Sequence, residues 1–251
     1  MDFNLDKGQH MLIDKEIVKK EISSAELSGK DNVIEIGAGK GILTNELAVH
    51  SGKVLAFEPD RKFQPYLDNV AKKNNNVKII YGDALKYNWK EYNKLVSNIP
   101  YFIAGPLMLK LLEENIEYAI LLVGEKFKNN LIEKENKTGV IASLFFNISE
   151  LTFVDKSCFN PQPRVNSYLV KLVRKNSLNI QEKTLLKIIT SKGKIKNALI
   201  SSLMNLGGTK RQAKELVESL GIDKPILNKP TQKITKNFIL RLKEKLKSLS
   251  L

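Results

Sequence analysis

Short apolar runs alternate with helical patterns through the first two thirds of the chain. From Asn32 the sequence reads NVIEI, a helical stretch, KVLAF, a polar helix, VKII and then KLVSN. Apolar runs of this length between helices are typical of parallel strands that are buried on both faces. We therefore expect a parallel sheet with helices on both sides, whose ligand crevice lies at the carboxyl ends of the strands.

The pattern changes near Lys175. Before it, EYAILLVGEKF reads as another buried strand, and ISELTFVDKSCF and SYLVKLVRK read as a closing pair of strands. After it come three stretches with helical spacing, broken at Gly207-Gly208 and at Lys224-Pro225. The sequence thus predicts an α/β domain over residues 1–175 and a small all-helical domain over residues 176–251.

Positive charge is concentrated in the second of these domains. The 251 residues carry 41 basic and 27 acidic side chains, a formal net charge of +14, and residues 176–251 alone hold 16 basic and 5 acidic ones. Such an excess attracts polyanions because bound phosphates release their counterions. A lysine-rich composition also arises from an A/T-biased genome, but the clustering favours a basic domain that binds RNA.

Several classes of protein are disfavoured by what the chain lacks. No apolar run approaches the ~20 residues of a membrane span, and the first residues lack the apolar stretch of a signal peptide. We therefore expect a soluble cytoplasmic protein without a membrane partner. Cys158 has no second cysteine, and the two histidines form no cluster with it at metal-ligand spacing, so we expect no metal.

A glycine-rich turn follows the first of the alternating strands. In EIGAGKG, Gly37, Gly39 and Gly41 stand between a strand and a helix, where the backbone can turn tightly and approach a ligand. We expect Gly37 and Gly39 to bind a cofactor. Taken alone, this turn suits a dinucleotide, a phosphate or S-adenosylmethionine, and it also occurs as a purely structural turn.

Two acids stand at the ends of the next two strands. Glu58 follows KVLAF, where a carboxylate can accept both hydroxyls of a ribose, and Asp83 follows VKII, where it can accept a hydrogen bond from an adenine amine. Either acid alone is equally a solvated loop residue. A nicotinamide dehydrogenase also shares the glycine turn and the ribose acid, but the ordered set of three favours a nucleoside cofactor on consecutive strand ends.

The loop after the fourth strand reads Asn98-Ile99-Pro100-Tyr101. An exocyclic adenine amine is a poor nucleophile because its lone pair is delocalised into the ring. The Asn98 side-chain oxygen and the Ile99 carbonyl can accept both amine protons, Pro100 stiffens the turn, and Tyr101 can stack on an extracted base. This loop predicts methyl transfer to an adenine amine; seen alone, it also suits an Asx-turn with a buried tyrosine.

On these residues the chain resembles the ribosomal RNA adenine dimethyltransferases, a family of KsgA-like small-subunit enzymes and Erm-type resistance methylases. The resemblance covers nearly the whole chain and includes KGQHMLID, DNVIEIGAGKGILT, FEPD, GDALK, NIPY and CFNPQPRVNSYLVKL. It implies a Rossmann-like S-adenosylmethionine-dependent methyltransferase domain that dimethylates adenosines of small-subunit ribosomal RNA during ribosome biogenesis. We expect a monomer whose partner is ribosomal RNA or a small-subunit precursor.

The resemblance also implies roles for individual residues. The family's cofactor contacts fall on His10, Leu12, Gly37, Glu58, Asp83 and Asn98, and its catalytic loop on Asn98, Ile99, Pro100 and Tyr101. Phe159 matches an aromatic residue expected near the flipped base, although a phenylalanine in an apolar stretch is ordinarily part of the core. His10 replaces the asparagine usual in the family, which leaves a backbone contact or a simple loop histidine as its role.

Two segments depart from the family pattern. Gly124, Lys126 and Asn130 replace the usual Gln, Glu and Arg after the fifth strand, and residues 138–142 read TGVIA where the family has Tyr-Gly-Arg-Leu-Ser. In such enzymes these segments lie around the target base and the RNA. The departures predict a change in substrate identity or rate rather than in cofactor use.

The tail favours the small-subunit subfamily, because SKGKIKNAL and LGIDKPILNKPTQKITKNFILRL resemble the KsgA-like helical domain.

Three alternatives stay open. An Erm-type methylase would modify the large subunit, since DNVIEIGAGKG is equally Erm-like. A non-catalytic assembly factor would use the methyltransferase-like domain only to hold nucleic acid, and a DNA adenine methyltransferase would apply the same amine chemistry to duplex DNA.

Overall fold

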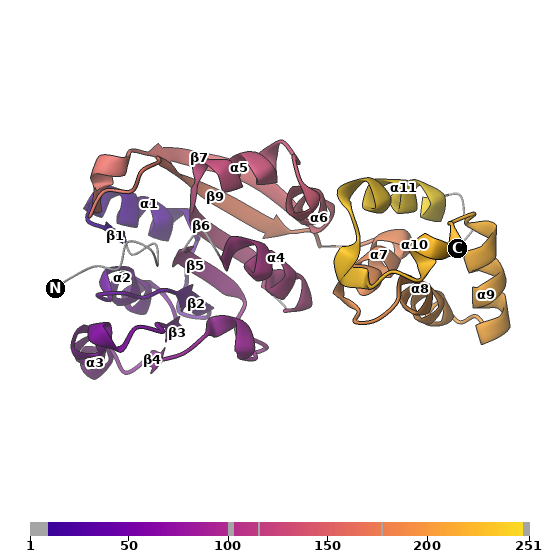
Figure 1. Cartoon of the computed structure of the whole chain (residues 1–251). Coiled ribbons are helices and arrows are strands. Elements are labelled where there is room, and N and C mark those ends of the chain that lie inside the picture. Colours follow the sequence, from indigo (N-terminus) through magenta and orange to yellow (C-terminus); the bar gives the residue numbers. More distant parts are fainter. Residues whose placement is uncertain (1–9, 100–102, 115, 177, 248–251) are drawn as a thin grey trace. The chain divides into compact units, whose positions relative to one another are not determined.

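The computed structural model describes residues 10–99, 103–114, 116–176 and 178–247, which fall into two compact units (Figure 1). The first unit comprises Met1–Glu133 and Phe146–Arg174, and the second comprises Lys134–Phe145 and Lys175–Leu251. The second unit therefore includes a segment that precedes the last strands of the sheet, whereas the sequence pattern predicts two contiguous domains.

The first unit is built on a mixed seven-stranded sheet with the order β4-β3-β2-β5-β6-β9-β7. Its strands are β2 Asn32–Ile36, β3 Lys53–Phe57, β4 Val77–Ile80, β5 Lys94–Asn98, β6 Tyr118–Gly124, β7 Phe146–Val154 and β9 Ser167–Arg174. The first five are mutually parallel, and β9 and β7 continue the sheet in antiparallel pairs. The predicted parallel sheet with a closing pair of strands is confirmed.

Five longer helices accompany this sheet: α1 Lys15–Ser24, α2 Ile42–His50, α3 Gln64–Lys73, α4 Ala104–Glu113 and α5 Glu125–Ile132. From β2 the chain proceeds toward one edge of the sheet, through α2, β3 and α3 to β4. From β5 it proceeds toward the opposite edge, through α4 to β6. Because each crossover is right-handed, this reversal places α2 and α3 on one face and α4 on the other (Figure 1).

One hydrophobic core fills the space between the sheet and α1, α2 and α3. Alternate strand residues point to this face: Val33 in β2, Val54 and Ala56 in β3, Val96 in β5, and Ile120 and Leu122 in β6. Helix residues opposite them include Val18, Ile22, Leu43, Leu47 and Leu67. By the same alternation, Glu35 and Asn98 lie on the face that carries α1.

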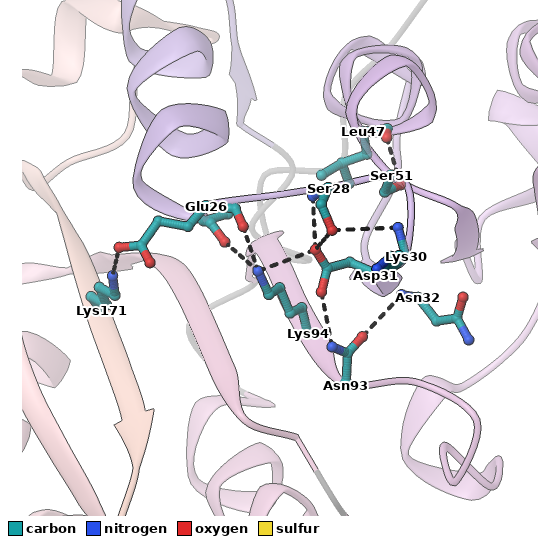
Figure 2. A network of polar contacts seen from close by, with 11 residues as sticks. Glu26, Ser28, Lys30, Asp31, Asn32, Leu47, Ser51, Asn93, Lys94 and Lys171 are labelled. Carbon is teal, nitrogen blue, oxygen red and sulfur yellow. Dashed lines mark hydrogen bonds and ion pairs between the residues drawn. The ribbon is translucent and has the colours of Figure 1, made fainter.

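A polar network ties α1 to the amino ends of β2 and β5 (Figure 2). The Lys94 ammonium lies 3.3 Å from the Asp31 carboxylate and donates to the carbonyls of Ala25, at 3.0 Å, and Glu26, at 2.6 Å. Asp31 also accepts a hydrogen bond from the Ser28 hydroxyl at 2.8 Å. The end of α1 is thereby fixed to the start of β5.

The second unit is helical. Its helices are α6 Lys137–Phe145, α7 Ile180–Thr190, α8 Ile195–Met204, α9 Lys210–Ser219, α10 Lys224–Leu227 and α11 Lys236–Lys247. Capping boxes begin α7 at Asn179 and α9 at Thr209, which explains where these helices start. Val140, Ile141 and Phe145 of α6 are buried, and α6 packs on α11. This packing accounts for the inclusion of residues 134–145 in the unit.

Candidate active site

A cavity of about 700 Å³ opens where the two directions of the sheet diverge, beside β2 and β5. The β2–β5 ladder ends at the pair Ile34 and Leu95. Beyond this pair the Ser97 hydroxyl donates to the Ile36 carbonyl at 2.7 Å, so a side-chain hydrogen bond stands where the next backbone hydrogen bond between the strands would be. The described lining residues come from 10–12, 35–38, 40, 42–43, 57–61, 63, 82–85, 98 and 103. The volume suits a ligand of nucleoside size.

The glycine turn forms one wall of this cavity. Gly37, Gly39 and Gly41 all have positive φ angles, of 79°, 53° and 78°, which L side chains rarely adopt. A Cβ at Gly41 would lie 2.8 Å from Val70, and one at Gly39 would lie 2.9 Å from the sulfur of Met11. Gly37 lines the cavity directly. All three glycines are therefore favoured by the φ angles of the turn, and Gly41 is also required by its close packing against Val70.

Glu58 lies at the end of β3 and is 5% exposed. One carboxyl oxygen accepts from the Gly39 amide and the other from the Asp60 amide, both at 2.9 Å. Burial raises the pKa of Glu58, and these two hydrogen bonds counter part of the rise. Gly39 is not among the described lining residues and donates its amide hydrogen bond to Glu58; its contact with a cofactor stays a prediction. The carboxylate keeps free lone pairs for ligand hydroxyls.

Asp83 lines the same cavity from the end of β4 but is exposed. One of its oxygens accepts from the Leu85 amide at 3.0 Å, and the other lies 3.9 Å from the Lys86 ammonium. The first bond caps the short helix Ala84–Lys86. Asp83 thus holds its own loop in shape while its carboxylate stays accessible to a ligand amine.

Glu35 is a lining residue that the sequence analysis did not single out. It lies in β2, is 2% exposed, and accepts a hydrogen bond from the Thr44 hydroxyl at 2.6 Å. Burial raises the pKa of Glu35 to about 8, with the Thr44 bond lowering it and the nearby Glu58 raising it further. The signal was a lone charged residue within the apolar run NVIEI.

The raised pKa of Glu35 makes stability depend on pH. A carboxyl that is protonated more readily when folded stabilises the fold at low pH, and this contribution is lost as the pH rises from the ordinary pKa of 4.5 to the folded pKa of about 8. We expect the Tm of the wild type to fall more steeply through this range than that of Glu35→Gln, whose amide oxygen still accepts from Thr44. Thermal unfolding at a series of pH values measures this; parallel profiles for the two proteins would refute it.

Asn98 ends β5 and is one of the residues that line the cavity. Its Oδ1 atom is buried and has no hydrogen-bond partner among the described residues. Buried polar atoms are almost always paired, so an unpaired acceptor beside a ligand cavity indicates a function. Ile99 is 3% exposed. Pro100 and Tyr101 of the predicted catalytic loop lie outside the described residues.

A two-stranded sheet brings the start of the chain to the same cavity. β1 (Met11–Leu12) pairs with β8 (Phe159–Asn160), with Leu12 opposite Phe159. His10 donates from Nδ1 to the Pro161 carbonyl at 2.8 Å, and both His10 and Leu12 line the cavity. Phe159 is 6% exposed, belongs to the core, and is not among the described lining residues. Its stacking on a base stays a prediction.

The two departures from the family pattern fall in different units. Gly124 is the last residue of β6 and precedes α5, which carries Lys126 and Asn130. Residues 138–142 lie in α6 of the second unit, where Gly139 to Ala142 are buried. The expected effect of the two departures on substrate identity or rate stays a prediction.

Two negative findings complete the description of the site. Within the described ranges, no group of three or more His, Cys, Asp or Glu side chains is arranged to hold a metal ion. No described helix is long and apolar enough to cross a membrane.

Comparison with known proteins identifies the family. The profile described as "Ribosomal RNA adenine dimethylase" matches residues 1–241. The chain belongs to this family. Among curated members of the ribosomal RNA adenine dimethylase family, a "Probable ribosomal RNA small subunit methyltransferase A" of Methanococcus maripaludis is 36% identical over 227 residues, covering 85% of this chain and 86% of its own. A protein with the same name from Thermococcus gammatolerans is 33% identical and covers 85% of this chain and 80% of its own.

Solved structures agree with this membership. A dimethyladenosine transferase from Plasmodium falciparum superposes with a TM-score of 0.65 at 25% identity, covering 93% of this chain and 96% of that one. The 23S rRNA methyltransferase ErmE gives the same TM-score of 0.65 at 22% identity, covering 94% of this chain and 99% of its own. The second likeness, at 22% identity, shows a shared fold.

Proposed function

We propose that this protein transfers methyl groups from S-adenosylmethionine to the exocyclic amine of adenosine in ribosomal RNA and dimethylates adenosines of the small subunit during ribosome biogenesis. The observation that carries the proposal is the convergence of Gly37, Glu58, Asp83 and Asn98 on one cavity. Four consecutive parallel strands supply these residues, in the order that a nucleoside cofactor followed by an adenine-binding loop requires. Family membership supports the same reaction.

The residues present fit the cofactor. The Gly37 turn admits a ligand against the backbone, the Glu58 carboxylate keeps lone pairs for ribose hydroxyls, and the Asp83 carboxylate is accessible to an adenine amine. When bound, S-adenosylmethionine supplies a methyl group activated by its positively charged sulfur. Leu12 and His10 close the cavity on the side of the N-terminal strand, where they limit access of water.

The chain's own contribution to the chemistry is to orient the target amine. The Asn98 Oδ1 atom and the Ile99 carbonyl accept hydrogen bonds from its two N–H groups and favour a pyramidal nitrogen with an available lone pair. Tyr101 and Phe159 stack on the base in this proposal. Positioning and hydrogen bonding of this kind do not call for a strong general base.

The small subunit is the substrate that the relatives favour. The proteins of Methanococcus maripaludis and Thermococcus gammatolerans, which share 36% and 33% identity with the chain, both carry small-subunit names. We place the activity in the cytoplasm, on a small-subunit precursor, and expect the enzyme to act as a monomer. Light scattering after size-exclusion chromatography tests the oligomeric state.

Methyl transfer to competing substrates tests the proposed function. Labelled S-adenosylmethionine is supplied with unmodified small subunits, large subunits or naked duplex DNA, and incorporated label is counted for each. We expect label in the small subunit. Label confined to the large subunit would indicate an Erm-type enzyme, label in DNA a DNA adenine methyltransferase, and binding of small subunits without any label a non-catalytic assembly factor.

We further propose that the basic second unit binds the RNA. Deletion of residues 176–251 is a poor test because it would expose the buried face of α6, which packs on α11. A milder test replaces three exposed basic residues of α9: Lys210, Arg211 and Lys214. Each phosphate contact contributes about 0.7–0.9 to the slope of log affinity against log salt, so replacing all three by glutamine should flatten that slope by about 2.

The matched control for this prediction changes three exposed lysines of the first unit, Lys53, Lys72 and Lys73, to glutamine. It removes the same charge from another surface. RNA affinity is measured by filter binding or anisotropy over a salt series. Equal slopes for wild type and the α9 variant, or equal flattening in the control, would show that α9 makes no specific phosphate contacts.

A further inference from the structure

Glu21 is a buried acid for which the fold alone gives no reason. It lies on the inward side of α1 with Val18, Ile22 and Ala25, at the spacing of an apolar helix face. It is 1% exposed, and neither of its carboxyl oxygens has a hydrogen-bond partner of good geometry among the described residues. An unpaired buried carboxyl lowers stability, so a position of this kind is expected at a functional site.

The polar groups that face Glu21 come from the active-site cavity. Burial raises its pKa well above the ordinary value, the Glu35 carboxyl raises it further, and the side chain of Asn98 lowers it. Both Glu35 and Asn98 line the cavity. Glu21 is therefore a neighbour of the residue that we expect to hold the target amine, although it does not itself line the cavity.

The backbone explains why these residues meet. Lys94, Val96 and Asn98 alternate along β5 toward the face that carries α1. Lys94 binds the Ala25 and Glu26 carbonyls at the end of α1, as Figure 2 shows. Glu21 lies one helical turn before Ala25, and Asn98 lies four residues beyond Lys94. The network in Figure 2 thus fixes the end of α1 beside the start of β5. Glu21 and Asn98 lie on the facing sides of these two elements, where their side chains interact.

The chemistry of this contact determines which way the Asn98 amide faces. Glu21 Oε1, Glu21 Oε2 and Asn98 Oδ1 are three buried acceptors without a donor. The Nδ2 group of Asn98 supplies that donor when it turns to the Glu21 carboxyl, and Oδ1 then faces the cavity. We infer that Glu21 is a positioning residue, which holds the Asn98 amide with its oxygen directed at the bound adenine amine.

This inference rests on the proposed function, and two variants of Glu21 test it. Glu21→Gln keeps an acceptor oxygen for Asn98 Nδ2, whereas Glu21→Leu has a similar volume and no acceptor. We expect Glu21→Leu to lower kcat about tenfold, the effect of one lost orienting hydrogen bond, without changing S-adenosylmethionine affinity. Glu21→Gln should restore most of the rate.

Thermal stability separates positioning from a structural role. Since Glu21→Leu removes an unpaired buried carboxyl, its Tm should rise by about 2–4 °C while its kcat falls. A purely structural glutamate would instead give a lower Tm, with kcat lost in parallel. Unchanged kcat in Glu21→Leu, or equal loss in the leucine and glutamine variants, would overturn the inference.

A readout without turnover keeps this test independent of the proposed function. The side-chain amide of Asn98 gives a ¹⁵N–¹H signal, which is assigned by its disappearance in Asn98→Ala. We expect this signal to shift in Glu21→Leu and to stay near its wild-type position in Glu21→Gln. An Asn98 signal insensitive to Glu21→Leu refutes the contact, whereas absence of methylation by the wild type refutes the proposed function instead.

Discussion

Replacing Asn98 by alanine is expected to lower kcat for methyl transfer at least ~10²-fold, which is the typical cost of one lost transition-state hydrogen bond. Asn98 lines the cavity at the end of β5, and its buried Oδ1 atom has no hydrogen-bond partner among the described residues. Affinity for S-adenosylmethionine should stay largely unchanged, because Glu58 and the glycine turn are intact. Single-turnover kinetics on small subunits and calorimetric cofactor binding measure the two effects separately.

The matched control for Asn98 is Asn69→Ala, the same substitution on the exposed side of α3. It should leave both kcat and cofactor affinity unchanged. If Asn98→Ala turned over at the wild-type rate, Asn98 would not hold the target amine. If it lost cofactor affinity and rate together, its role would lie in cofactor binding.

The second large effect is on stability, at the network of Figure 2. Replacing Lys94 by methionine should lower the free energy of unfolding by ~3–5 kcal/mol, because it leaves the buried Asp31 without its cation. The carbonyls of Ala25 and Glu26 lose their donor as well. Urea unfolding followed by circular dichroism gives the difference.

Lys171 provides the comparison for Lys94. Its ammonium lies 2.6 Å from the carboxylate oxygen of Glu26, and the Glu26 side chain is 61% exposed. The Lys171 side chain is 16% exposed and its ammonium also lies over the Tyr118 ring. Because its carboxylate partner is solvated, the pair contributes only ~0–1 kcal/mol, so Lys171→Met should lose much less stability than Lys94→Met. Losses of equal size in the two variants would mean that the Lys94 network contributes no more than a surface ion pair. Since Lys94 anchors α1, its replacement should also disturb the contact between Glu21 and Asn98.

The parallel sheet and the glycine turn were predictable because their signals are local. NVIEI, KVLAF and KLVSN are short, largely apolar runs typical of buried strands, and Gly37, Gly39 and Gly41 supply the positive φ angles that a tight turn needs. Strand direction then places Glu58, Asp83 and Asn98 at one edge of the sheet. The sequence was therefore sufficient to bring these residues to one cavity, and their roles there stay predictions.

Contacts between distant segments were not predictable in this way. The pairing of Leu12 with Phe159 joins two short strands whose patterns carry no signal of their own. The inclusion of Lys134–Phe145 in the second unit depends on packing against α11, about a hundred residues later. Local hydrophobic periodicity describes which face of a helix is buried but not which element buries it.

The buried acids show the same limit at the level of single residues. Glu35 breaks an apolar strand and Glu21 breaks the apolar face of α1, so both are visible as irregularities. Their meaning depends on neighbours from other elements. Thr44 pairs with Glu35, and Asn98 faces Glu21 across 77 positions of sequence. A charged residue on a predicted buried face thus indicates a polar contact in the core, although the sequence does not name the partner.

Nucleoside mass analysis of small-subunit RNA after incubation with the enzyme and S-adenosylmethionine tests the central claim most directly. The account predicts N6,N6-dimethyladenosine with the wild type and at most traces of it with Asn98→Ala. Methylation on another base or another atom of adenine, or the same yield of dimethyladenosine from Asn98→Ala, would contradict it.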